Sequence, residues 1–220
     1  MNRKQFLSML SAVGAALVLM PATTLLAQQQ AVSDKDFQAL SGHVPTEAAP
    51  GKVEVLEFFW YGCPHCYAFD PTISAWSKHL PEDVSFRRVH VPFFSRPHQQ
   101  MFYALQALGR EDEQTRGVIF EAIQKQHKPM QQLDEMKDVL TQAKVDSQAF
   151  ENAYNSFGVK TQMQRANKLT TAYAIDGVPT LAVNGRYTTS PSMAGSNERA
   201  VVVLDELIKR ERTAPKDSGQ

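Results

Sequence analysis

Residues 53–66 read VEVLEFF-WYGCPHC, a run of β-branched and aromatic side chains that ends at two cysteines. The first seven residues have the composition of a buried strand. A helical pattern runs from Cys63 to about residue 80 and contains Pro71, where we expect a kink. Residues 84–91 alternate well enough for a second strand. Strand, helix and strand at this spacing predict a βαβ unit with parallel strands.

Residues 94–167 contain no convincing strand. Their apolar side chains recur at helical spacing in four segments, the last of which places Phe157 on its inner face. A longer helical pattern then reaches about residue 175. Residues expected to cap or separate these helices are Gly109, Asp112, Asp146 or Ser147, and Gly158. Helices inserted between strands in this way predict a separate helical lobe.

The strand pattern resumes after the helices. TLAV at 180–183 and RYTT at 186–189 flank Asn184-Gly185, which is the strongest short hairpin signal. Ser196 is placed to cap a last helix that reaches about residue 212. Residues 28–50 are polar and leave room for one short edge strand, and we expect residues 213–220 to be a disordered tail.

The overall composition is that of a folded globular protein. The chain has 220 residues, of which 43% are hydrophobic and 21% charged, with 23 basic and 23 acidic side chains. This excludes collagen-like, coiled-coil and wholly disordered chains. The zero net charge argues against a nucleic-acid partner. Two cysteines are far fewer than a disulfide-stapled scaffold needs.

The N-terminus has the pattern of a secretory signal peptide. Arg3 and Lys4 precede an apolar run at 6–20, and Ala27 comes just before a polar stretch. We expect residues 1–27 to be removed by cleavage near Ala27, which places the mature chain in the periplasm. The alternative is a membrane anchor, but the apolar run falls short of the roughly 20 residues that a spanning helix needs.

The two cysteines form a C-x-x-C motif where a strand gives way to a helix, which is typical of a redox dithiol. Cys63 falls at the helix N-terminus, where free backbone N–H groups and the helix dipole stabilise a negative charge. Because the thiolate is the nucleophile, this position makes Cys63 reactive at neutral pH. Cys66 lies one turn further in, where it is expected to be shielded and to resolve a mixed disulfide with Cys63.

Two alternatives concern the same cysteines. A structural disulfide closing a loop of about four residues would contribute only about 2 kcal/mol, so the bridge would be a poor staple. A zinc site built on Cys63, His65 and Cys66 would lack a fourth ligand, and no second Cys/His cluster has suitable spacing. We therefore expect no metal.

The residues between the cysteines adjust the chemistry of Cys63. Pro64 lacks an N–H group and suits the first helical turn. His65 can direct a donor or a positive charge at the Cys63 sulfur. The helix dipole usually supplies only about 0.3–1 kcal/mol, so His65 and local N–H donors must provide most of any larger stabilisation. The other histidines are expected to be surface or structural residues.

These residues resemble the DsbA family of thiol:disulfide oxidoreductases. The similarity rests on VLEFF at 55–59, CPHCY at 63–67, GVPT at 177–180, the hairpin and the helical insertion. It implies an α/β, thioredoxin-like fold with an inserted all-helical lobe. The thioredoxin-like domain would comprise residues 28–93 and 168–212, and the helical domain residues 94–167.

The resemblance also implies roles for residues outside the motif. Pro179 would be a cis-proline facing the dithiol, and the backbone of Val178 would pair with an extended substrate. Glu57 and Arg88 would form a charged pair beneath the site, with Glu57 moving protons to or from Cys66. The family has lysine where this chain has Arg88, and arginine does not deprotonate; an ordinary structural ion pair is the alternative. His90 would lie close to the site.

The leading functional hypothesis is an enzyme that donates its Cys63–Cys66 disulfide to newly exported proteins through a mixed disulfide at Cys63. It would need no cofactor, work as a monomer, and be reoxidised by a quinone-linked, DsbB-like membrane protein, as the resemblance implies. Isomerase or reductase activity, a holdase that uses an apolar surface, and metal delivery are the alternatives.

Overall fold

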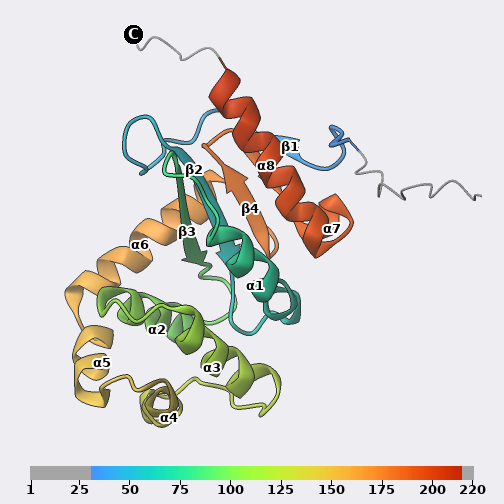
Figure 1. The fold of residues 1–220 in the computed structure, drawn as a ribbon. Coiled ribbons are helices and arrows are strands. Elements are labelled where there is room, and N and C mark those ends of the chain that lie inside the picture. The colour runs from blue at the N-terminus through green and yellow to red at the C-terminus, as the bar shows by residue number, and fades with distance from the viewer. Residues whose placement is uncertain (1–30, 215–220) are drawn as a thin grey trace, which may run out of the picture. The chain divides into compact units, whose positions relative to one another are not determined.

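The predicted βαβ unit is present. β2 (Val53–Phe59), α1 (Pro64–Ser77) and β3 (Val84–His90) follow one another, and β2 pairs in parallel with β3 (Figure 1). The computed structural model describes residues 31–214. The predicted signal peptide and most of the predicted tail lie outside this range. No helix within it is long and apolar enough to cross a membrane.

The sheet has five strands in the order β1-β5-β4-β2-β3. β4 (Thr180–Val183) pairs antiparallel with both β2 and β5 (Tyr187–Thr189), and the short edge strand β1 (Gln38–Ala39) pairs with β5. The hairpin expected at Asn184-Gly185 is confirmed: φ is +48° and +68° at these two residues, the left-handed conformation that such a turn requires.

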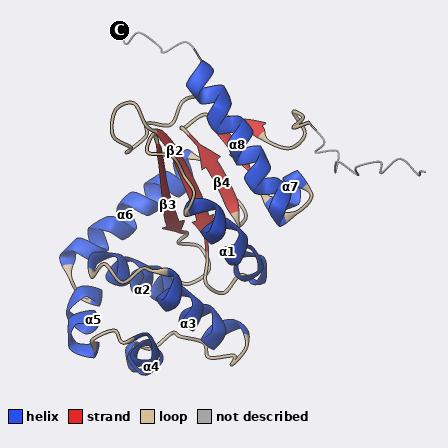
Figure 2. Ribbon diagram, viewed as in Figure 1, coloured by secondary structure: helices blue, strands red, loops and turns tan. Residues whose placement is uncertain are grey.

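Alternating side chains of β2 divide the core between two faces. Val53 and Val55 face a cluster with apolar residues of α1 and of α8 (Asn197–Thr213), while Leu56 and Phe58 join a larger cluster with the inserted helices. Figure 2 shows α1 and α8 on one side of the sheet and α6 on the other. Since every residue of β2 is buried, the strand holds the dithiol on a rigid base.

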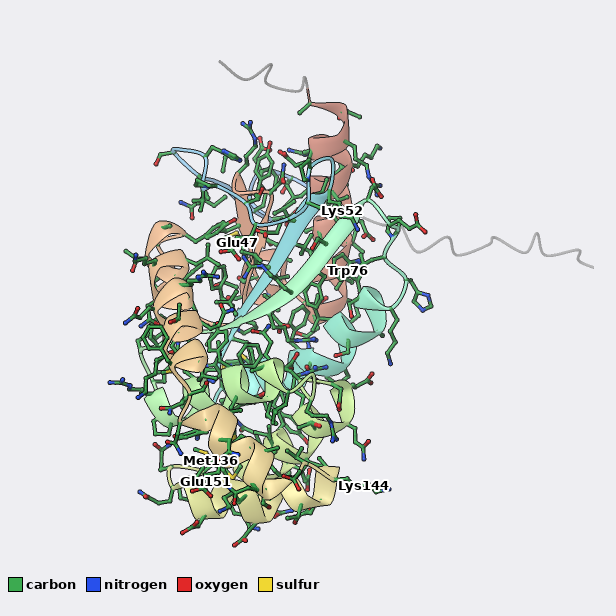
Figure 3. The ribbon with its side chains drawn as sticks, turned by 90° about the vertical axis from the view of Figure 1, so that its left-hand side faces the viewer. Glu47, Lys52, Trp76, Met136, Lys144 and Glu151 are labelled. Atoms are coloured by element: carbon green, nitrogen blue, oxygen red, sulfur yellow. The ribbon has the colours of Figure 1, made fainter. Side chains whose placement is uncertain are left out.

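Five α-helices separate β3 from β4. They are α2 (Arg96–Ala107), α3 (Glu113–Gln124), α4 (Leu133–Leu140), α5 (Ser147–Tyr154) and α6 (Phe157–Ala172), with a 3₁₀ turn at Thr141–Ala143. α4 and α5 form the part of the insertion that lies farthest from the sheet, where Figure 3 labels Met136 and Glu151. The boundary predicted at 167/168 falls inside α6.

Most predicted helix boundaries are confirmed, and one is wrong. Asp112, Asp146 and Ser196 each accept a backbone N–H bond at an N-cap. Gly158, however, does not separate two helices. It lies in the first turn of α6, whose cap is Ser156, because the Ser156 hydroxyl accepts a bond from the Val159 N–H group.

That change of boundary also alters the environment of Phe157. The side chain was expected on the inner face of the preceding helix, but as the first residue of α6 it is 84% exposed. The short helix α7 (Pro191–Ala194) was not predicted. Four residues are too few to produce a helical period in the sequence.

Candidate active site

The Cys63 sulfur lies at the start of α1, as the sequence predicts. Cys63 is the N-cap residue, with φ −84° and ψ 117°, and its Sγ accepts a hydrogen bond of 3.4 Å from the Cys66 N–H group. Pro64 occupies the first turn, where no N–H donor is lost. The cap geometry therefore aims unpaired backbone donors at the sulfur that must carry a negative charge.

Both cysteines are free thiols, and both are buried. Cys66 is the more shielded of the two, as expected, since 1% of Cys66 is accessible against 7% of Cys63. The Val178 carbonyl accepts a 3.4 Å bond from the Cys63 thiol, and this loop covers part of the sulfur. Attack on Cys63 is therefore restricted to a narrow direction.

The two thiols have opposite acidities. The pKa of Cys63 is lowered to about 6, chiefly by a hydrogen bond from the Cys66 side chain; burial opposes this, and the backbone N–H groups of Cys66 and His65 support it. The charge of the exposed His65 ring contributes least. Burial raises the pKa of Cys66, and the Cys63 sulfur raises it further. The pair thus consists of one ready nucleophile and one protonated donor.

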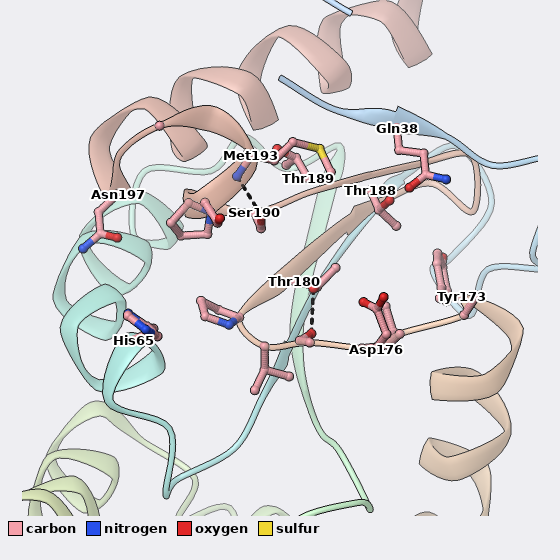
Figure 4. Close-up of a pocket in the computed structure, with 18 of the residues that line it drawn as sticks. Gln38, His65, Tyr173, Asp176, Thr180, Thr188, Thr189, Ser190, Met193 and Asn197 are labelled. Carbon is pink, nitrogen blue, oxygen red and sulfur yellow. Dashed lines mark hydrogen bonds between the residues drawn. The ribbon is translucent and has the colours of Figure 1, made fainter. Parts of the chain in front are cut away.

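A cavity of about 870 Å³ opens beside the dithiol (Figure 4). His65 of α1 and the loop that carries Val178 and Pro179 line it, together with Met193 and Asn197. The Val178–Pro179 peptide bond is cis, as the resemblance implies. The cavity is large enough for side chains of an extended peptide beside Cys63.

Glu57 and Arg88 lie opposite each other on β2 and β3, where their side chains form a buried ion pair. Glu57 Oε2 lies 2.8 Å from Arg88 Nε, although the angle is too poor for a hydrogen bond. Burial raises the pKa of Glu57 to about 7, against the attraction of Arg88. This carboxyl group can gain or lose a proton near neutral pH.

The charged pair extends into a network that sequence reasoning missed. Arg88 Nη2 donates to Ser74 Oγ at 3.0 Å and approaches Asp70 at 3.5 Å. Arg116 of α3 bonds the same two residues, at 2.9 Å and 2.7 Å. Nothing in the sequence indicates this grouping, because the partners are separated by up to 46 positions. The network joins α1, β3 and α3 beneath the dithiol.

His90 is fully buried next to the turn before Cys63, as the resemblance implies. Its Nδ1 lies 3.0 Å from the Val91 carbonyl, which only accepts, so Nδ1 carries the proton. Nε2 then accepts from the Tyr61 N–H group at 3.5 Å. Burial lowers the pKa of His90 to about 3, so the ring is neutral and positions the turn.

Comparison with known proteins agrees with this geometry. A family described as the DSBA-like thioredoxin domain matches residues 54–203. The chain is 46% identical over 184 residues to the thiol:disulfide interchange protein DsbA of Pseudomonas aeruginosa, covering 83% of this chain and 86% of that protein. It is 47% identical over 182 residues to the DsbA of Azotobacter vinelandii, with coverage of 82% and 84%. The chain belongs to the DsbA family.

Solved structures support the same assignment. The crystal structure of Pseudomonas aeruginosa DsbA superposes with a TM-score of 0.78 at 46% identity, over 81% of this chain and 93% of that one. The oxidoreductase NmDsbA1 from Neisseria meningitidis superposes with a TM-score of 0.70 at 27% identity, over 83% and 96%. The expected α/β thioredoxin-like fold with a helical insertion is confirmed, and the DsbA-family chain is a thiol:disulfide oxidoreductase.

Proposed function

We propose that this DsbA-family enzyme passes a Cys63–Cys66 disulfide to newly exported proteins. The observation that carries the proposal is the acidity of Cys63, whose pKa is lowered to about 6 at a helix N-cap while Cys66 stays protonated. A stable thiolate in the reduced form favours reduction of the enzyme, and that makes its disulfide an oxidant.

The reaction then proceeds in two exchanges. A client thiolate attacks the Cys63 sulfur, the Cys63–Cys66 bond breaks, and the Cys66 sulfur leaves and takes up a proton. A second client thiolate then attacks the client sulfur of the mixed disulfide, and Cys63 leaves as its stabilised thiolate. Two electrons pass from two client thiols to the enzyme dithiol, and the client gains one disulfide.

Val178 and Pro179 are proposed to position the client. The Val178 carbonyl already lies 3.4 Å from the Cys63 sulfur, so a client strand beside this loop would bring its own sulfur close to Cys63. The adjacent cavity would hold side chains that flank the client cysteine. Only the backbone of Val178 is involved, which suits an enzyme that oxidises clients of many sequences.

Glu57 is proposed to exchange the Cys66 proton. Burial raises the pKa of Glu57 to about 7. The negative charge of Glu57 is in turn one of the causes that raise the pKa of Cys66. Arg88 remains charged and holds the carboxylate in place. His65 and Pro64 are proposed to tune the Cys63 thiolate from within the motif.

The remaining proposals concern export, partners and domain organisation rather than the active site. Residues 1–27 would direct export to the periplasm and be removed near Ala27. The mature enzyme would act as a monomer on reduced exported proteins and be reoxidised by a quinone-linked, DsbB-like membrane protein. The sheet with α1 and α8 would form the thioredoxin-like domain and the inserted helices the helical one, with α6 running across the boundary between them.

The test uses a reduced, unfolded client with two cysteines. Cys66→Ser, first converted by oxidised glutathione to its Cys63–glutathione disulfide, is expected to exchange glutathione for a client thiolate and give a Cys63–client mixed disulfide, whereas Cys63→Ser forms none and loses turnover. A glutathione titration is expected to give a potential well above that of a typical thioredoxin. Client binding that survives Cys63→Ser, with no oxidation by the wild-type enzyme, would instead indicate a holdase.

A further inference from the structure

The turn before the dithiol is organised around Trp60. The Trp60 carbonyl accepts a 3.0 Å hydrogen bond from the Cys63 N–H group and so closes the turn that sets the N-cap. The indole ring lies directly over Gly62, where an added Cβ would come within 2.2 Å of Trp60 Cζ2. The Trp60 backbone also acts on Cys66, where it lowers the pKa of the thiol against the larger effect of burial. The position of Trp60 therefore affects both cysteines.

His98, on α2, holds the indole. Trp60 Nε1 donates to His98 Nδ1 at 3.1 Å. On the other side of the ring, His98 Nε2 lies 2.9 Å from the Pro129 carbonyl, which only accepts, so Nε2 carries the proton. The amide nitrogen of Gln131 also lies 3.2 Å from Nε2, but its two hydrogens are donated to Ser95 Oγ and the Pro129 carbonyl. Nδ1 is left with the lone pair that the indole needs. The bond to Pro129 thus fixes the tautomer that binds Trp60.

The indole is not held by packing alone. On its outer face the indole stacks on Phe94, at 4.6 Å between ring centroids. Because Phe94 is 51% exposed, this contact offers little resistance to movement of the indole. His98 itself is 2% exposed and is anchored on α2, whose cap Ser95 bonds the His98 N–H group. The rigid support for Trp60 therefore comes from the His98 ring.

We propose that His98 is a positioning residue for thiol–disulfide exchange, which holds Trp60 across Gly62 and thereby keeps the Cys63 sulfur against the N–H donors of α1. The proposal rests on the proposed role of Cys63. Without the indole bond, the turn at 60–63 is free to relax, and the sulfur loses part of its alignment with the Cys66 and His65 N–H groups. The thiolate is then less stable.

Protonation of His98 should have the same effect as its removal. A second proton on Nδ1 would face the indole N–H, and neither group accepts. Burial lowers the pKa of His98, while the Pro129 carbonyl and the charge of Glu135 on α4 act in the opposite direction. The other titratable ring nearby is His90, at 6.5 Å between centroids, and it is neutral. The neutral ring is therefore the state that holds the indole, and burial extends this state to lower pH.

A double-mutant cycle on the reduced enzyme tests this coupling. Iodoacetamide alkylation of Cys63 is followed from pH 5 to 9, and its midpoint reports the stability of the thiolate without depending on client oxidation. His98→Leu and Trp60→Phe are each expected to lower the ionisation constant of Cys63 about fivefold, the value of one lost hydrogen bond, and the double variant no further. Effects that multiply in the double variant, or a Trp60→Phe midpoint equal to that of wild type, would overturn the proposal, even if His98→Leu failed to fold.

A fluorescence titration provides the readout that a purely structural role would not change. The chain has two tryptophans, so a Trp76→Phe background leaves Trp60 as the reporter, and the oxidised enzyme is used because Cys63 then has no thiol that titrates in the same range. Its emission is expected to change as the pH falls below 6.5, and His98→Leu is expected to abolish the change. His79→Gln, at an exposed histidine, serves as the matched control and should retain it. A titration that persists in His98→Leu would contradict the assignment.

Slow alkylation of wild-type Cys63 at pH 5, equal to that of an ordinary thiol, would count against the proposed function itself. Rapid wild-type alkylation combined with independent effects of the two substitutions would count only against the role of His98. The two failures are therefore distinguishable in one set of measurements.

Discussion

At the Cys63 sulfur, a side-chain donor, two backbone N–H groups and one imidazole act on a single thiolate. The sequence locates this atom, because a strand followed by C-x-x-C predicts a helix N-terminus at the first cysteine. It does not reveal the order of the contributions. The Cys66 thiol comes first and the His65 charge last, whereas the motif alone suggested a large share for His65.

Replacement of His65 should therefore make the enzyme a slightly weaker oxidant. As the smallest cause, His65 is expected to account for less than one pKa unit, so His65→Ala should lower the reduction potential by less than about 30 mV. Because the side chain is exposed, the circular dichroism spectrum should match that of wild type. The potential is measured by glutathione titration; an unchanged or higher value would show that His65 does not stabilise the thiolate.

Glu57 should make stability depend on pH in a predictable direction. Its folded pKa of about 7 lies above the ordinary 4.5, so the folded state binds the proton more tightly than the unfolded state. Its contribution is greatest below pH 4.5 and is lost as the pH rises to about 7. Between pH 4.5 and 7, the wild-type free energy of unfolding should fall by up to about 3 kcal/mol because of Glu57, and the Glu57→Gln protein should not show this fall.

Urea denaturation of wild type and Glu57→Gln between pH 4 and 8 checks this prediction. The wild-type free energy of unfolding should fall relative to that of the variant as the pH rises. Parallel curves would show that folding does not raise the pKa of Glu57, and the proposed proton exchange with Cys66 would fail with it.

Among the elements, strands and long helices were predictable because each has a strong period. Every residue of β2 is buried, and its β-branched and aromatic residues predict this burial, although not that of Glu54 and Glu57. The hairpin was predictable because Asn184-Gly185 selects one turn type. The start of α6 was not, because a glycine in a helical first turn resembles a helix break and only the structure shows that Ser156 is the cap.

Two glycine substitutions test that correction. Gly158 has an ordinary helical φ, and an added Cβ would meet only Ser156 Oγ at 3.8 Å, so Gly158→Ala should stabilise the protein by about 0.5–1 kcal/mol. Gly109, the residue after the α2 C-cap, has φ +64°, so Gly109→Ala should destabilise it by about 1 kcal/mol. Urea denaturation should give opposite signs; destabilisation by Gly158→Ala would restore the predicted break.

For the whole molecule, the sequence predicts the sheet and the helical insertion but not the hydrogen bonds that connect them. These bonds join residues that are distant in sequence. Arg116 of α3 donates to Asp70 of α1, and Gln124 of α3 donates to the Tyr61 carbonyl at 2.9 Å. No local period encodes such pairs. They place the support of the dithiol in the insertion as well as in the sheet.

The global stability of the two redox forms should diverge with pH. The folded pKa of Cys63, about 6, is depressed below the unfolded value of about 8.5, and only the reduced form has this thiol. The resulting stabilisation is fully present above about pH 8.5 and is lost as the pH falls through 6. It amounts to about 3 kcal/mol at most.

Denaturation of both forms across pH 5–9 measures this difference. The free energy of unfolding of the reduced enzyme should rise relative to that of the oxidised enzyme over the upper part of the range. A difference that stays constant would mean that the fold does not stabilise the Cys63 thiolate.

The most direct test of the account is the pH dependence of Cys63 alkylation in the reduced wild-type enzyme, with the modified residue identified by mass spectrometry. The account predicts a midpoint near pH 6 and no modification of Cys66 in the folded protein. A midpoint near 8.5, the value of an ordinary thiol, or modification of Cys66 before Cys63, would contradict it.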